Sequence, residues 1–300
     1  GIRLELFEQE RVDRMQGSIY QDKTIFVLLP GFAFSKSIAG TNLFGGVHRG
    51  FTPPSSGALK ILNFGENLDD SGLDLDAEKS WNKELGIRGT LSLIEYEFAG
   101  FHIDIENLVA AGRGTAFKNL GKVTSQGLEA RMGITLSQIS FFLPDVHVSY
   151  AFLSTEVNDA TITSNVSGSF GSEISIDGKE LPYSPNHTLT AGLEFKPMSN
   201  LQLRTDLRFV SKAYTDFENI EDSDKIGVSG PVPEYSILNV SGSYQFNNSL
   251  KVFFSGKNIT DEVYIGSRLH SNPGQKEANI SSGIIPGPRR QVNIGLEYSF

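Results

Sequence analysis

The sequence predicts an all-β protein, an antiparallel transmembrane β-barrel. The final segment, residues 289–300, alternates strictly between apolar and polar side chains, as does a strand with one face in lipid. Segments of about ten residues with the same period recur along the chain. The connections between them alternate between short and long, which is typical of membrane barrels and not of soluble sandwiches.

The last strand shows the pattern most clearly. Val292, Ile294 and Leu296 share one phase with the terminal Phe300, and Asn293 lies on the opposite phase. A chain that ends on an aromatic residue in phase with its apolar face is typical of outer-membrane barrels. The same alternation is present in residues 128–136, 201–209 and 238–246.

The recurring pattern predicts about twelve strands. In chain order they cover residues 2–12, 31–37, 42–50, 80–92, 95–108, 121–137, 143–156, 186–196, 201–215, 235–247, 249–264 and 289–300. Tight connections are expected near residues 38–41, 92–95, 197–200 and 247–249. The long connections are 13–30, 51–79, 109–120, 157–185, 216–234 and 265–288.

The unequal connections also predict an orientation. Membrane barrels have short turns on the periplasmic side and long loops outside the cell. We therefore expect Phe300 and the turn 38–41 to share the periplasmic end. The connections 157–185 and 265–288 are expected at the cell surface.

Composition excludes other classes. With 31 Gly, 21 Phe and only 39% hydrophobic residues, the chain contains no apolar run near the length of a membrane helix. The absence of cysteine fits passage through an oxidising periplasm. The net charge of −9 argues against a nucleic-acid partner.

The first residues predict a missing neighbour. Gly1 opens directly on an alternating segment, without an initiator methionine or a signal peptide. A strand with an unpaired edge in hydrocarbon leaves its backbone polar groups unsatisfied. We therefore expect residues 1–300 to be the C-terminal portion of a longer barrel domain.

One segment resembles a known family. Residues 43–54 read LFGGVHRGFTPP, which resembles the strand FGGVHRGFxPP of TonB-dependent receptors, especially those of the ferric citrate type. Further segments follow in the family's order, namely 84–88, 121–123, 127–130, 180–187, 258–264 and 286–290.

The resemblance implies the architecture and partners of the whole receptor. It implies an outer-membrane barrel of about 22 strands, of which about ten lie upstream, closed by a separate N-terminal plug domain. The plug, which is absent from this sequence, engages the TonB complex of the inner membrane. The expected protein is a monomer in the outer-membrane lipid of a Gram-negative bacterium. Its expected ligand is a ferric chelate, either ferric citrate or a siderophore.

Candidate ligand residues are cations and hydrogen-bond donors, because a chelator presents an anionic or polar surface to the protein. In residues 42–50, a lipid-facing Val47 places His48 inward, and Arg49 must then lie at the outer rim or beyond a bulge. Arg208 and Lys212 lie on the inward phase, and Arg268 and His270 lie in a long loop. A competing interpretation pairs lumen arginines with the plug or with Glu129, Glu194 and Asp206.

No catalytic, metal or cofactor site is expected. No second histidine or carboxylate follows His48 at metal-ligand spacing, and none of the five histidines has a convincing Ser/His/acid arrangement. The prediction is therefore a non-enzymatic active-transport receptor. The alternatives are a passive or structural barrel without a plug, and a receptor of the same family for cobalamin, haem or a glycan.

Overall fold

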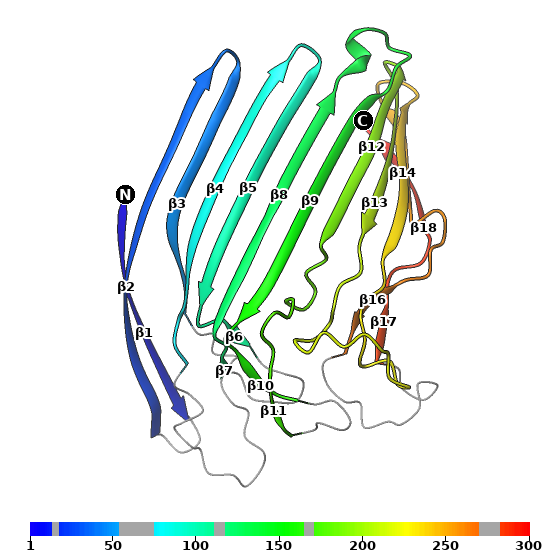
Figure 1. Ribbon diagram of the computed structural model, residues 1–300. Coiled ribbons are helices and arrows are strands. Elements are labelled where there is room, and N and C mark those ends of the chain that lie inside the picture. Colours follow the sequence, from blue (N-terminus) through cyan, green and yellow to red (C-terminus); the bar gives the residue numbers. More distant parts are fainter. Residues whose placement is uncertain (14–17, 54–74, 111–117, 165–170, 270–282) are drawn as a thin grey trace.

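The computed structural model describes residues 1–13, 18–53, 75–110, 118–164, 171–269 and 283–300. Its main element is one antiparallel sheet of 12 strands, each hydrogen-bonded to the next in chain order (Figure 1). All twelve predicted strands are present, so the predicted all-β antiparallel architecture is confirmed. The strands are β1 (Ile2–Asp13), β2 (Ser18–Ile38), β3 (Thr41–Thr52), β4 (Glu78–Leu91), β5 (Ile94–Glu106), β8 (Lys122–Ile134), β9 (Asp145–Asn158), β12 (His187–Met198), β13 (Leu201–Val210), β14 (Tyr235–Gln245), β15 (Leu250–Lys257) and β18 (Gln291–Tyr298).

The two ends of the sheet differ as the sequence predicts. Tight connections such as Ala39–Gly40 lie at one end, here called the turn end, and the long connections lie at the other, the loop end (Figure 1). Gly40 has a φ of 85°, a conformation that glycine adopts without steric cost. The C-terminus lies at the turn end, so the expectation that Phe300 and the turn 38–41 share one end of the sheet is confirmed (Figure 1).

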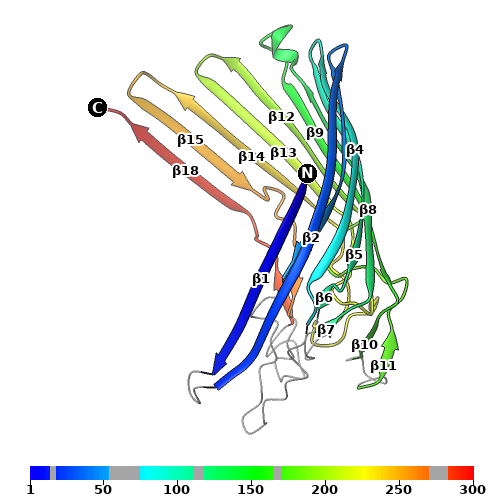
Figure 2. The same cartoon turned by 90° about the vertical axis from the view of Figure 1, so that its left-hand side faces the viewer.

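The sheet is curved (Figure 2), and the side chains on its two faces differ. One phase of the strands exposes large apolar side chains, and this outer face includes Leu85, Ile87, Phe98, Leu128, Leu193, Leu207, Ile294 and Leu296. The opposite phase, the inner face, carries Arg88, Glu97, Arg131, Arg204 and Asp206. A soluble protein rarely exposes a continuous apolar surface of this kind. Lipid outside and water inside satisfy both faces.

Strand β2 is longer than predicted. Residues 18–30, expected within a loop, extend β2 toward the loop end and pair with β1 through most of its length. The cause is that both phases are apolar here: Ile25 and Val27 are buried, whereas Phe26 and Leu28 are exposed. A run without polar residues hides the two-residue period on which the sequence prediction depends.

Several other predicted strands end earlier. The segments predicted to extend to residues 137, 215 and 264 leave the main sheet at Ile134, Val210 and Lys257. Beyond Ile134 the chain forms a short 3-10 helix, η3 (Leu136–Gln138), before β9. Beyond Val210, Ala213 pairs with Val232 of the same connection instead of with a neighbouring strand. Within the described ranges, no helix is long and apolar enough to cross a membrane.

The long connections contain structure of their own. Three short hairpins are formed by β6 (Val109–Ala110) with β7 (Lys118–Asn119), β10 (Thr161–Thr163) with β11 (Glu173–Ser175), and β16 (Ile265–Arg268) with β17 (Ile284–Pro286). A small hydrophobic core lies at the loop end, made of Leu120, Val123, Val157, Ala160, Ile162 and Ile176. The connections that contain β6–β7 and β10–β11 therefore pack against each other at the loop end.

The assignment of faces predicts the cost of a charge on each side of β18. Ile294→Arg places a cation on the outer face, where the native side chain is 75% exposed, and should cost about 2–4 kcal/mol near the bilayer midplane. Asn293→Arg is the control, because the neighbouring residue lies on the inner face beside Ser255. The folded fraction of the full-length receptor in lipid vesicles, read from heat-modifiable gel migration, should fall only for Ile294→Arg. Equal losses would contradict the assignment.

Candidate functional site

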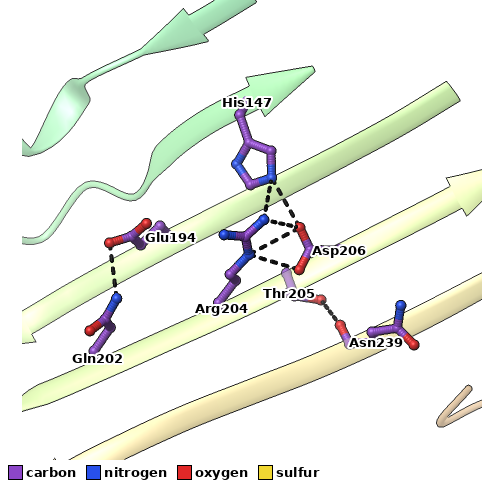
Figure 3. Close-up of polar contacts among 7 residues, drawn as sticks. All are labelled: His147, Glu194, Gln202, Arg204, Thr205, Asp206 and Asn239. Carbon is purple, nitrogen blue, oxygen red and sulfur yellow. Dashed lines mark hydrogen bonds and ion pairs between the residues drawn. The ribbon is translucent and has the colours of Figure 1, made fainter. Parts of the chain in front are cut away.

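The side chains of His147, Arg204 and Asp206 form a hydrogen-bonded cluster on the inner face (Figure 3). Arg204 and Asp206 project from β13, and the guanidinium donates from Nε to Oδ2 at 2.9 Å and from Nη2 to Oδ1 at 2.9 Å. Nε2 of His147, on β9, lies 3.0 Å from Oδ1 of Asp206 and 3.3 Å from Nη2 of Arg204. The competing prediction that lumen arginines pair with local acids is thus met by Arg204 and Asp206.

The contact between His147 and Asp206 passes over an intervening strand. The residue between them is Gly192 of β12, which is opposite His147 on one side and Asp206 on the other. A Cβ on Gly192 would lie 2.1 Å from Nε2 of His147 and 2.6 Å from Oδ1 of Asp206. The glycine therefore provides the space in which the side chains of His147, Arg204 and Asp206 meet.

Glu194 and Glu129, the other two predicted acidic partners, form no ion pair with an arginine in the described ranges. Glu194 accepts a hydrogen bond from Nε2 of Gln202 at 3.1 Å and forms an ion pair with Lys196 (Figure 3). Glu129 forms no ion pair with any residue in the described ranges.

Arg208 lies closer to the loop end on the same inner phase of β13. Its side chain is exposed and forms no hydrogen bond or ion pair with any described residue. Nearby, the rings of Tyr235 and Tyr264 stack with centroids 4.4 Å apart. Tyr235 lies on the same inner phase, two residues from Ile237, the cross-strand partner of Arg208. Burial raises the pKa of the Tyr264 phenol, and the charge of Arg208 opposes that rise. We call the inner face at the loop end the inner mouth. It combines Arg208, a cation without a partner among the described residues, with the aromatic surface of Tyr235 and Tyr264.

Lys212 lies just beyond the end of β13 and is already paired. Its Nζ donates to both carboxylate oxygens of Glu221 at 3.0 and 2.9 Å and lies 4.9 Å from the ring centre of Tyr214. The Tyr214 hydroxyl donates to Oε1 of Glu221 at 2.5 Å. These bonds hold the pKa of Glu221 below its ordinary value and raise the pKa of both Lys212 and Tyr214. At neutral pH Glu221 is therefore ionised, Lys212 is protonated and charged, and Tyr214 keeps its proton.

Arg268 ends β16 and is only 3% exposed. Its Nη1 donates to the carbonyl of Gly227 at 2.6 Å, Nε and Nη2 donate to the carbonyl of Pro231 at 3.2 and 2.9 Å, and Nη2 donates to Ser223 Oγ at 3.0 Å. A guanidinium committed to backbone acceptors in the interior of the loops has no surface for a ligand. The sequence analysis expected Arg268 to be a ligand residue in an open loop, whereas its side chain is enclosed by the connection between β13 and β14.

His48 and Arg49 point to opposite faces, as alternation requires. Strand β3 pairs with β2 and β4 without a register shift, so no bulge redirects Arg49. Its guanidinium lies 5.7 Å from the ring centre of Trp81 and 3.9 Å from a carboxylate oxygen of Glu106, on the outer face near the loop end. His48 lies on the inner phase, but five strands separate β3 from β13 in the sheet. His270 lies outside the described residues.

A turn after β15 was not predicted and holds the base of the last long connection. Oδ1 of Asn258 accepts a hydrogen bond from the Glu262 N–H at 2.9 Å, and Nδ2 donates to the carbonyls of Glu262 and Pro288 at 2.9 and 3.0 Å. Asp261 receives a two-pronged bond from Arg289, with distances of 2.9 and 2.6 Å. Asn258 and Asp261 both adopt the left-handed conformation, which Asn and Asp tolerate better than most residues. The presence of these two residue types in a segment assigned to a strand was the available signal in the sequence.

The arrangement supports the binding of anionic or polar molecules. No group of three or more His, Asp or Glu side chains suited to a metal ion occurs among the described residues. What the inner mouth offers is a set of cations, hydroxyls and aromatic rings, which recognise anionic or polar molecules.

A comparison with family models decides the family. The model described as TonB dependent receptor-like, beta-barrel matches residues 1–259. The chain belongs to this receptor family. Its members are outer-membrane transport proteins of Gram-negative bacteria and not enzymes, which confirms the predicted location and class.

Solved receptor structures share the fold. The ferric citrate transporter FecA in its unliganded form aligns with a TM-score of 0.76 and 22% identity, over 99% of this chain and 42% of FecA. The siderophore receptor PiuA from Acinetobacter baumannii aligns with a TM-score of 0.69 and 16% identity, over 99% and 40% of the two chains. The copper transporter OprC aligns with a TM-score of 0.70 and 15% identity, over 93% and 40%. The chain thus spans less than half the length of these receptors.

The Asp261 contacts predict a pH dependence at the base of the last loop. The bonds from Arg289 and the Arg290 N–H hold the pKa of Asp261 well below its ordinary value of 3.8. A lowered folded-state pKa stabilises the turn above the ordinary pKa, and this stabilisation is lost as the pH falls toward the folded-state value. Asp261→Asn should therefore speed amide exchange in residues 258–264 of the receptor at pH 7 and speed it by a smaller factor near pH 2, where part of the stabilisation has already been lost.

The matched control is Glu262→Gln, which removes an adjacent exposed carboxylate whose side chain forms no bond in the described structure. Exchange would be measured by mass spectrometry after correction for the intrinsic rate at each pH. A difference between Asp261→Asn and wild type that persists unchanged near pH 2 would contradict the assignment to the ion pair.

Proposed function

We propose that this chain is the ligand-binding, C-terminal barrel portion of an active-transport receptor for a ferric chelate, either ferric citrate or a siderophore. Membership of the family and the fold shared with ferric citrate and siderophore receptors support the general class, uptake of iron complexes. The observation that carries the choice of an anionic chelate is Arg208 at the inner mouth, which is exposed and bonds to no residue that the structure describes.

The proposed ligand residues are Arg208, Lys212 and His48, with Tyr235 and Tyr264 as an aromatic surface. Arg208 contributes most, because its guanidinium needs no other bond to be broken before it binds a carboxylate or hydroxamate oxygen. Lys212 contributes less, because an incoming anion competes with Glu221 for the same ammonium group. We leave Arg49 out of the proposed set, because its guanidinium lies beside Trp81 and Glu106 on the outer face.

The proposed transport cycle follows from this location. The loop end is the cell surface, where the chelate enters, and the turn end is periplasmic. The ligand binds without covalent change, and the TonB complex then supplies the energy that rearranges a plug domain outside this chain. We further propose that the receptor works as a monomer surrounded by outer-membrane lipid.

The proposed site predicts an order of effects on binding. In the full-length receptor, Arg208→Gln should weaken ferric citrate binding about tenfold, which corresponds to about 1.4 kcal/mol, and Lys212→Gln should weaken it less. Raising the salt concentration from 50 to 300 mM should weaken wild-type binding in the same direction, because exposed charges are screened. Isothermal titration calorimetry measures both effects.

Arg131→Gln serves as the control, because it removes an equal charge from an exposed inner-face position nearer the turn end. Binding that ignores Arg208, Lys212 and salt alike would remove these residues from the site. Tight binding of haem or cobalamin with no ferric citrate binding would assign a different ligand of the family.

Energy coupling distinguishes active transport from a passive or structural barrel. Uptake of radiolabelled ferric citrate by cells that produce the receptor should stop when the TonB complex is deleted, while binding at the cell surface remains. A passive channel would give equal uptake with and without TonB. The comparison therefore tests the mechanism independently of the residues that bind the ligand.

A further inference from the structure

Three connections at the loop end meet at Arg268, two through its buried side chain and the third through its backbone. The guanidinium belongs to β16, and its acceptors, Ser223, Gly227 and Pro231, belong to the connection between β13 and β14. These acceptors surround a planar group that carries five N–H donors. A lysine ammonium could not reach them in the same geometry, because it presents a single point of charge.

The connection between β9 and β12 joins the same contact through Tyr183. The Tyr183 hydroxyl donates to the Arg268 carbonyl at 3.1 Å and lies 3.1 Å from the Arg268 N–H, which donates to it in turn. The Tyr183 N–H donates to the carbonyl of Tyr214 at 2.7 Å. Tyr183 thus contacts both of the other connections, one through its side chain and one through its backbone.

Two further contacts join the segments independently of Arg268. The side chain of Asn219 donates to the Glu180 carbonyl at 3.0 Å and accepts from the Glu180 N–H at 2.7 Å. The N–H of Gly283 donates to the carbonyl of Ile226 at 2.7 Å. A Cβ on Gly283 would lie 2.6 Å from the backbone nitrogen of Val228, so this approach depends on glycine.

These contacts define a surface unit that we call the clamped wall: residues 180–184, 211–232, 264–269 and 283–287. Lys212, Tyr214 and Tyr264 belong to it. Figure 1 shows the segments from these three connections together at the loop end, near β16 and β17. A ligand that meets the clamped wall meets groups whose mutual positions are fixed by hydrogen bonds within the protein.

We propose that Arg268 is a positioning residue that joins three connections into one preassembled wall of the mouth and so holds Lys212 and Tyr264 in place for the ligand. This inference rests on the proposed function for its ligand and on the contacts alone for the wall. A preassembled site binds more tightly because less freedom is lost on binding. The wall should therefore behave as one unit before any ligand is present.

Amide hydrogen exchange in the full-length receptor without ligand tests the wall. Arg268→Met keeps the length of the side chain and removes all its donors, and should speed exchange at least tenfold in all three connections together. Lys225→Met is the control, because Lys225 is exposed on the same connection and forms no bond in the described structure. Gly283→Ala, which separates residues 226–228 from β17 without touching Arg268, should produce the same joint increase. Faster exchange confined to one connection would overturn the proposal.

Ligand binding tests the positioning role. Arg268→Met should weaken ferric citrate binding about tenfold, and saturating ferric citrate should slow the exchange of residues 283–286 back toward the wild-type rate. That recovery is required by linkage if the ligand and Arg268 stabilise the same arrangement, and a purely structural arginine would not produce it. Unchanged affinity, or no recovery at 283–286, would overturn positioning. A wild-type receptor that does not bind ferric citrate would refute the proposed ligand, and the ligand-free exchange would still decide the wall.

Discussion

The satisfaction of backbone hydrogen bonds in hydrocarbon determines the rest of this structure. Each N–H or C=O left unpaired in lipid costs several kcal/mol, so a chain that crosses the membrane as strands must bond every strand to its neighbours. Sequential antiparallel pairing achieves this with the shortest connections, and the twelve strands follow that order without a crossover. Pairing then fixes which side chains face lipid and which face the lumen, because alternation leaves no third direction. Strands β1 and β18 are the two edges of this sheet and are not hydrogen-bonded to each other.

The sequence was sufficient where one strand face is apolar and the other polar. Residues such as Leu128 and Arg131 lie on the faces that alternation predicts, and the inward direction of His48 follows from Val47. It was insufficient where the period was absent, as in β2, whose two phases are both apolar near Val27. It also missed interactions between residues far apart in the chain. Arg268 resembles a loop cation open to solvent until the acceptors from residues 223–231 are placed around it.

The barrel strands form a fold that occurs in other receptors, whereas the loop end holds the cations proposed to bind the ligand. The same fold occurs in transporters named for ferric citrate, a siderophore and copper, at identities near or below 22%. The apolar outer face and the paired strands are therefore compatible with many cargoes. At the loop end of this chain, Arg208 forms no bond with any described residue, Lys212 is paired with Glu221, and Arg268 is enclosed. Three cations of equal formal charge thus have three different capacities to attract an anion.

Gly192 has a consequence for how the strands find their alignment. A sheet of alternating residues tolerates a slip of two positions, since every side chain then returns to its original face. Such a slip of β12 would place Thr190 or Glu194 between His147 and Asp206, and either side chain would fill the space that the glycine leaves. The bridge across β12 can close in one alignment of the three strands and in none of its two-residue neighbours. The contact across Gly192 on the inner face therefore favours one strand register. The apolar side chains of the outer face do not distinguish that register from its two-residue neighbours, because such a slip returns each of them to the same face.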